Sequence, residues 1–149
     1  MRFGLTCLLL LLLGFRAVSQ PAYTPAGRSL ELFRQYQPVI EKTNEAIVQE
    51  PLAVTGDING DSLEDCIVFF VLTPRTGGNI VVDRQAAVYL NTGSTMKVAG
   101  AFPDLHYCYV VDRIAGQLIY IKEYRCRPPY DEYVAEHRLA WRKGKIRLL

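Results

Sequence analysis

The sequence predicts an α+β fold, in which an N-terminal helix region packs on an antiparallel β-meander sheet within a single small domain. Apolar residues recur at helical spacing between Ser29 and about Gln49, and short strand-like segments separated by turn residues follow from Leu52 onward. About 130 residues remain once an N-terminal leader is set aside, which is the commonest size of one domain.

The leader has the three parts of a secretory signal peptide. Arg2 gives a positive start, residues 5–13 form an apolar run, and Ala17, Val18 and Ser19 form a small-x-small cleavage site. A membrane anchor is the alternative, but it needs about 20 apolar residues, and Gly14 and then Arg16 break this run. We therefore expect residues 1–19 to be a cleaved signal peptide.

The rest of the chain is expected to comprise a disordered leader over residues 20–27 and a single α+β domain over 28–149. Removing residues 1–19 takes away two of the 17 basic residues and none of the 15 acidic ones, so the net charge falls from +2 to zero. A neutral domain has no overall attraction for nucleic acid or anionic lipid. We expect a secreted or periplasmic protein that binds no nucleic acid and has no membrane segment after cleavage.

The helical region is expected to begin at Ser29 as the N-cap, with Glu31 in its first turn. Pro38 interrupts the pattern, because proline removes an amide donor and clashes with the preceding turn. Two outcomes are open: a kink near Gln37, or two short helices of which Pro38 opens the second.

The β-region is expected to begin at residues 52–54. Residues 66–72 are apolar on both faces, which predicts a central strand covered on both sides. Turn residues separate three further pairs of strands: 84–90 with 95–101, 107–112 with 118–125, and 132–141 with 145–148. Lys143, Lys145 and Arg147 make a local basic tail, which we interpret as a solvated strand face.

Three cysteines follow the signal peptide, and an odd number in an oxidising compartment indicates one bridge and one thiol, or an intermolecular link. Cys66 lies in the apolar strand, where a small buried hydrophobe serves packing. Cys108 and Cys126 are the better pair, since some registers of their hairpin bring the Cα atoms within the roughly 4.4–6.8 Å that a disulfide needs.

A carboxylate-rich loop over residues 57–65 carries the main functional prediction. Ca²⁺ takes six to eight oxygen ligands at about 2.3–2.6 Å, which a short loop supplies when side-chain oxygens alternate along it. The expected ligands, at loop positions 1, 3, 5, 7 and 9, are Asp57, Asn59, Asp61, the backbone carbonyl of Leu63, and Asp65.

The loop is not an EF-hand, because Ser62 replaces the required glycine and the twelfth position has no glutamate. The order strand, D-x-[DN]-x-D-x-x-x-D and apolar strand, over residues 54–68, resembles the calcium loops of FG-GAP and VCBS-type repeats. Those repeats form β-propeller blades of exported proteins and have glycine where Ser62 stands. With no internal repeat in the chain, the resemblance implies a calcium loop but no propeller. The alternative is a metal-free turn, in which Asn and Asp cap their own backbone and Gly60 has a positive φ.

An enzymatic interpretation starts from residues 60–63, which spell the GDSL motif of hydrolases with Ser62 as nucleophile. That chemistry needs a histidine base oriented by an acid, and the D-x-x-H stretch of the family is missing around His106 and His137. We therefore expect no enzyme.

Tyrosines gather in the C-terminal half, where they pack a sheet or line a recognition face together with arginines: Tyr107, Tyr109, Tyr120, Tyr124, Tyr130, Tyr133, Arg125, Arg127 and Arg138. The leading hypothesis is an exported module that binds an unknown protein partner, with Ca²⁺ as a cofactor of its loop. The alternatives are a small secreted hydrolase and a metal-free structural domain.

Overall fold

A computed structural model of the protein describes residues 24–77, 80–105, 108–126 and 132–149. Within these ranges the chain forms one helix and eight strands. They are α1 (Pro25–Thr43), β1 (Ala46–Gly56), β2 (Asp65–Pro74), β3 (Asp83–Asn91), β4 (Met96–Ala101), β5 (Cys108–Ala115), β6 (Leu118–Tyr124), β7 (Tyr133–Arg142) and β8 (Lys145–Leu148). The predicted α+β class is confirmed.

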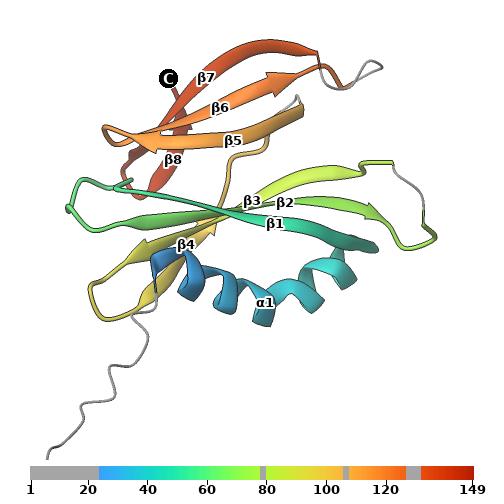
Figure 1. Ribbon diagram of the computed structural model, residues 1–149, viewed down its shortest axis with the longest axis horizontal. Coiled ribbons are helices and arrows are strands. Elements are labelled where there is room, and N and C mark those ends of the chain that lie inside the picture. The colour runs from blue at the N-terminus through green and yellow to red at the C-terminus, as the bar shows by residue number, and fades with distance from the viewer. Residues whose placement is uncertain (1–23, 78–79, 106–107, 127–131) are drawn as a thin grey trace, which may run out of the picture.

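The strands form two four-stranded antiparallel sheets, each a simple meander, in the orders β1-β2-β3-β4 and β5-β6-β7-β8. The single meander sheet that we expected is thus divided, between β4 and β5. Helix α1 covers one face of the first sheet and the second sheet stacks on its other face (Figure 1). No described element covers the outer face of the second sheet, which is the face turned away from β1–β4.

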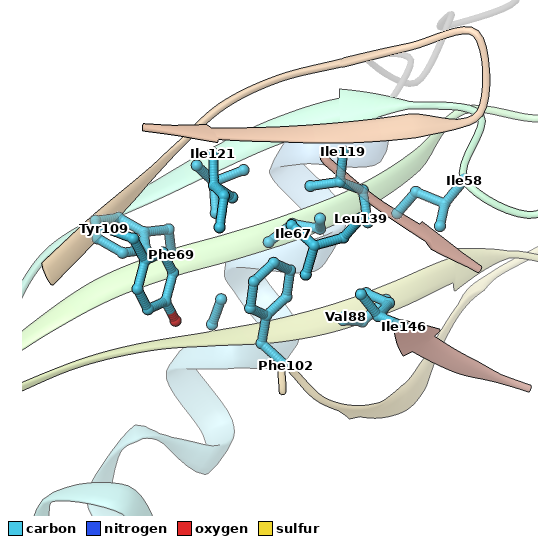
Figure 2. Close-up of a cluster of buried hydrophobic side chains, with 12 residues drawn as sticks. Ile58, Ile67, Phe69, Val88, Phe102, Tyr109, Ile119, Ile121, Leu139 and Ile146 are labelled. Atoms are coloured by element: carbon cyan, nitrogen blue, oxygen red, sulfur yellow. The ribbon is translucent and has the colours of Figure 1, made fainter. Parts of the chain in front are cut away.

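Two apolar cores hold the three layers together. Between the sheets, Ile67 and Phe69 of β2 pack with residues that include Val111, Ile119 and Ile121 (Figure 2). Between the first sheet and α1, the core comprises Phe33, Ala46, Val48, Cys66, Val68, Phe70, Leu72, Tyr89 and Met96. Successive residues of β2 alternate between the two cores. The predicted central strand covered on both faces is confirmed.

The start of α1 differs from the prediction. Thr24, not Ser29, is the N-cap: its hydroxyl accepts a hydrogen bond of 3.2 Å from the backbone N–H of Gly27, and Pro25 opens the helix. Proline suits the first helical position because its missing N–H would have no partner there. Ser29 lies inside the helix and is fully buried. The part of the expected leader from Pro25 to Gly27 therefore belongs to α1.

The end of α1 also corrects the prediction. The helix is continuous through Pro38 and ends at Thr43, so the alternative of two short helices is wrong. Asn44 caps it, with its side-chain amide donating to the carbonyl of Ile40 at 2.8 Å. None of the described helices is long and apolar enough to cross a membrane.

Residues 46–49, which we assigned to the helical region, lie instead in β1. Ala46 and Val48 are buried against α1 while Ile47 is exposed, which is the two-residue alternation of a strand. The pairing of β1 with β2 shifts between Gln49 and Leu52. Pro51 lies at this irregularity, on an edge strand, where its missing N–H costs no ladder hydrogen bond.

The cysteines are arranged as predicted. Cys108 and Cys126 form a disulfide with Cα atoms 5.3 Å apart. Cys66 is a buried free thiol between α1 and the first sheet. Burial raises the pKa of this thiol to about 11, so it is protonated and unreactive at neutral pH.

Candidate functional site

The loop between β1 and β2, residues 57–64, is shaped by hydrogen bonds from its backbone to its own side chains. The carboxylate of Asp57 accepts from the N–H of Gly60 at 2.7 Å and from the N–H of Ser62 at 3.0 Å. These two hydrogen bonds hold the backbone that follows Asp57 around its carboxylate. This is the self-capping behaviour that Asp and Asn show in turns.

The next two polar side chains repeat this arrangement. Asn59 accepts from the N–H of Asp61 at 3.0 Å, and Asp61 accepts from the N–H of Leu63 at 2.8 Å. The side-chain amide of Asn59 also donates to the second oxygen of Asp61 at 2.9 Å. Every second side chain of the loop thus accepts a hydrogen bond from the backbone of the same loop.

Asp65 anchors the loop to the fold. It is fully buried, and its two oxygens accept from the N–H groups of Ile58 at 2.9 Å and Asn91 at 2.8 Å. Burial raises the pKa of this carboxyl, against the opposing effect of the two N–H donors. The side chain of Ile58 is 1% exposed and lies in the core between the sheets (Figure 2). The loop is therefore fixed to β3 and to the core.

The chemistry of these side chains fits a hard cation, since all are oxygen donors. A carboxylate or amide oxygen that accepts one N–H keeps another lone pair for a further partner. In the ranges that the structure describes, however, no three His, Cys, Asp or Glu side chains lie close enough together to hold a metal ion. Asp57, Asp61 and Asp65 thus do not form such a group in this conformation, and calcium stays a prediction.

Two residues of the loop have left-handed backbone. Gly60 has a φ of 85°, and a Cβ atom there would lie 3.1 Å from the carboxamide of Gln117. Ser62 has a φ of 68°, although it is not glycine. The position at which the calcium repeats have glycine is thus one where this backbone favours glycine.

We expect Ser62→Gly to stabilise the domain by about 0.5–1 kcal/mol. A left-handed conformation costs a residue with a Cβ atom roughly 1–2 kcal/mol, and glycine removes this cost. Glycine also has greater freedom in the unfolded chain, which destabilises the fold by about 0.4–1 kcal/mol and offsets part of the gain. Urea unfolding measures the difference. Ser94→Gly, at an exposed position without positive φ, is the control and should be neutral or destabilising. An equal effect of the two changes would refute the strain at Ser62.

A second candidate site is the outer face of the second sheet, where a row of three side chains crosses three strands. Arg113 of β5 pairs with Tyr120 of β6, which pairs with Arg138 of β7. The guanidinium carbon of Arg113 lies 3.9 Å from the centroid of the Tyr120 ring, and that of Arg138 lies 5.7 Å from it. An aromatic ring between two cations is an amphipathic surface of the kind that protein partners use.

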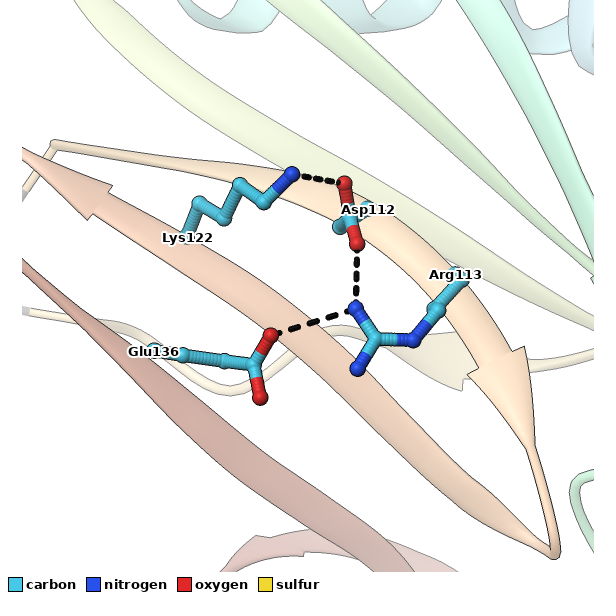
Figure 3. Close-up of polar contacts among 4 residues, drawn as sticks. All are labelled: Asp112, Arg113, Lys122 and Glu136. Carbon is cyan, nitrogen blue, oxygen red and sulfur yellow. Dashed lines mark hydrogen bonds and ion pairs between the residues drawn. The ribbon is translucent and has the colours of Figure 1, made fainter. Parts of the chain in front are cut away.

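Charged groups beside this row form a network (Figure 3). Asp112 lies between Lys122 and Arg113 and bonds to both, and Arg113 also contacts Glu136 at 3.1 Å. The pairing of β5 with β6 shifts between Val111 and Arg113, which makes room for Asp112 beside Arg113. This irregularity was not predicted, because no glycine or proline in the strand indicates it.

The network predicts a pH dependence. The hydrogen bonds from Lys122 and then Arg113 lower the pKa of Asp112 below its ordinary value of 3.8. A lowered folded-state pKa means that the ionised carboxylate stabilises the fold fully above about pH 5, and that this contribution disappears as the pH falls through the folded pKa. Unfolding of wild type and Asp112→Asn at several pH values should show a stability difference that shrinks in acid. A difference that is constant with pH would contradict this.

The tyrosines divide between the two faces of the second sheet. Tyr109 lies in the core, with its ring 5.7 Å from that of Phe102. Tyr124 and Tyr133 pair on the outer face with ring centroids 6.3 Å apart, beside the row that contains Tyr120. Tyr107, Tyr130 and Arg127 lie outside the described residues. Arg125, also considered for the face, is paired with Glu132 at 3.0 Å.

The residues considered for hydrolase chemistry lie on different sheets. Ser62 is exposed in the loop of the first sheet, while His137 belongs to β7 of the second sheet. The Nε2 atom of His137 lies 2.7 Å from a carboxylate oxygen of Glu123. His106 is outside the described residues.

Comparison with known proteins gives no assignment: no family model matches the chain, and neither a curated protein nor a solved structure shows significant similarity to it.

Proposed function

We propose that this protein is an exported, non-enzymatic module that binds another protein through the outer face of its second sheet. The observation that carries the proposal is the row in which Tyr120 lies between Arg113 and Arg138, on a sheet face that no described element covers. Interfaces are enriched in tyrosine and arginine, and such residues dominate binding energies. The first sheet, covered on both faces, serves as the scaffold.

Export is supported by the signal-peptide features of residues 1–19 and by the disulfide between Cys108 and Cys126. Disulfides persist in oxidising compartments and are rare in the cytosol. The proposed location is therefore the periplasm or the extracellular space. A protein partner in either compartment can reach the outer face of the second sheet.

The test is capture of binding proteins from the native periplasm or culture medium by the immobilised domain. Tyr120→Ala with Arg138→Ala should abolish capture of any specific partner. Tyr36→Ala with Arg34→Ala is the matched control, because it removes the same two side-chain types from exposed positions on α1, on the opposite side of the molecule. Equal capture by both double variants would refute the proposed face.

We further propose that the loop binds Ca²⁺ through Asp57, Asn59, Asp61, Asp65 and the carbonyl of Leu63. The proposal is supported by the alternating oxygens and by the resemblance to calcium repeats. Binding would require the side chains to draw together around the ion, and the spare lone pairs of their oxygens permit this. Such a cation would stabilise the loop that joins β1 to β2.

Calorimetric titration with Ca²⁺ tests this proposal. Heat release and a rise in melting temperature are expected for the wild type and not for Asp57→Ala with Asp61→Ala. Asp83→Ala with Asp104→Ala removes two carboxylates outside the loop and should bind as the wild type does. Absence of heat and of any thermal shift in the wild type would leave the loop a metal-free turn. Turnover of a generic ester that is lost in Ser62→Ala would instead contradict the non-enzymatic proposal.

A further inference from the structure

The outer face of the second sheet continues past the row that contains Tyr120 into a corner of positive charge. Ile146 of β8 belongs to the core between the sheets, so its neighbours Lys145 and Arg147 lie on the opposite, outer face. Arg142 of β7 is paired with Lys145 and therefore shares that face. We call Arg142, Lys145 and Arg147 the basic corner, and all three are exposed.

The basic corner adjoins the row directly. Arg147 of β8 lies opposite Ala140 of β7. Along the same face of β7, Ala140 stands between Arg138 and Arg142. Arg147 is therefore the diagonal neighbour of both arginines, and such neighbours lie roughly 7–8 Å apart, within reach of long side chains. The corner and the row thus form one continuous surface.

The charges of the basic corner are not neutralised within the described part of the chain. None of its three residues forms an ion pair with a described residue. The acidic residues beside the row, Asp112 and Glu136, are instead bonded to Arg113, and Asp112 also to Lys122 (Figure 3). An anionic group over the corner would therefore meet positive charges that have no other partner there.

The arrangement of the basic corner does not serve the stability of the fold. Arg142 lies directly opposite Lys145, and like charges in that position destabilise a sheet. Charged side chains on an edge strand such as β8 also deter unwanted pairing, but an acidic residue at position 145 would do this without the like-charge cost. The positive charge on both strands indicates a role outside the fold.

The charge of the whole chain is divided in the same sense. Residues 20–104, which include α1 and the first sheet, contain ten acidic and six basic residues, a net charge of −4. Residues 105–149, which include the second sheet, contain five acidic and nine basic residues, a net charge of +4. An anionic partner is thus attracted to the second sheet and repelled by the first.

We propose that the basic corner binds an acidic segment of a protein partner, while the row that contains Tyr120 contacts the adjoining surface of the same partner. This inference rests on the proposed function and names the chemistry of the partner. An anionic membrane is disfavoured, because Asp112 and Glu136 lie on the same face and would be repelled by a layer of negative headgroups. A discrete acidic segment can lie over the corner without meeting them.

A fluorescently labelled octaglutamate peptide, in the absence of calcium, is the probe. Fluorescence anisotropy should show saturable binding that weakens at about 150 mM ionic strength, where charges are screened beyond about 8 Å. Octaglutamine, of the same length without charge, should not bind. The backbone amides of residues 142–147 should show the largest NMR shifts. Absence of saturable binding at low salt, or shifts centred elsewhere, would overturn the proposal.

Variants of the corner test its role. Arg142→Gln with Lys145→Gln and Arg147→Gln should weaken peptide binding by at least about tenfold, which corresponds to about 1.4 kcal/mol. Lys145→Glu alone places an acid opposite Arg142, so it should melt at or above the temperature of the wild type and still bind the peptide more weakly. Wild-type affinity in this folded variant would refute the corner.

A matched control removes the same kinds of charge elsewhere. Arg34→Gln with Arg75→Gln and Lys97→Gln takes two arginines and one lysine from exposed positions outside the second sheet. Its affinity for the peptide should stay within about threefold of the wild type, a change of about 0.65 kcal/mol. Equal weakening in the two triple variants would show attraction to the overall charge and would overturn the proposal.

Two further measurements exclude other occupants of the corner. Vesicles of phosphatidylglycerol and phosphatidylcholine in equal parts should not displace the peptide, and displacement would assign the corner to a membrane. Sedimentation at low salt should show no self-association that the corner variant abolishes. Such self-association would assign the corner to the negative half of a second copy. Either result would overturn the proposal.

The captured partner separates this inference from the proposed function. A partner that is lost with Tyr120→Ala and Arg138→Ala, yet binds the triple variant of the corner as it binds the wild type, would refute the acidic segment and leave the proposed face standing. A partner that is retained by Tyr120→Ala with Arg138→Ala would refute the proposed face itself. We expect both variants to lose it.

Discussion

Asp65→Ala should lower the free energy of unfolding by about 2–4 kcal/mol. The change leaves the N–H groups of Ile58 and Asn91 without their carboxylate partner, and a buried donor without a partner costs roughly 1–3 kcal/mol. It also releases the connection between the loop and β3. Urea unfolding at neutral pH without calcium measures the loss.

Glu64→Ala is the control, since Glu64 is the exposed neighbour in the same loop and its carboxylate accepts a hydrogen bond of 3.3 Å from the hydroxyl of Thr55. A change of less than about 0.5 kcal/mol is expected there, as is usual for surface substitutions. Similar losses at both positions would mean that the loop responds to its total charge, and that Asp65 has no special anchoring role.

Phe33→Ala should cost about 3–5 kcal/mol, the usual range for removing a buried phenylalanine. Phe33 is fully buried beneath α1, with its ring centroid 4.8 Å from that of Phe70 in β2. The change opens a cavity between the helix and the first sheet. Chemical denaturation gives the loss, and faster hydrogen exchange in α1 should accompany it.

Tyr36→Ala provides the comparison on the same helix, because Tyr36 is 51% exposed. We expect a loss below about 1 kcal/mol, since little apolar surface leaves a packed environment. If both changes cost the same, α1 would owe its stability to helix propensity, and its packing on the sheet would be incidental.

The hairpins could be predicted because their signals are local. The turn at residues 91–94 contains Asn and Gly between alternating apolar residues, and β3 and β4 form there. The start of α1 was missed although its signal was present, since Thr24 before Pro25 is a good cap with proline at the first helical position. Ile47 continued the helical spacing by coincidence, and tertiary packing placed it in a strand.

The division into two sheets could not be predicted from the pattern of apolar residues. A strand with one buried face alternates in the same way whether one sheet or two follow. For the loop, the sequence indicated a turn rich in oxygen donors, but not the role of Asp65. Its partner Asn91 is 26 residues away, and only the pairing of β2 with β3 brings them together.

The connection of each sheet as a simple meander has a consequence for how the chain folds. Every β-pair joins strands that are consecutive in the sequence, so each closes a short loop and little chain entropy is lost before contacts form. Helix α1 and β1–β4 occupy the N-terminal two thirds and enclose a core of their own. Synthesised first, this part of the chain can become ordered before β5 emerges. The second sheet can then condense on a finished surface, one hairpin at a time.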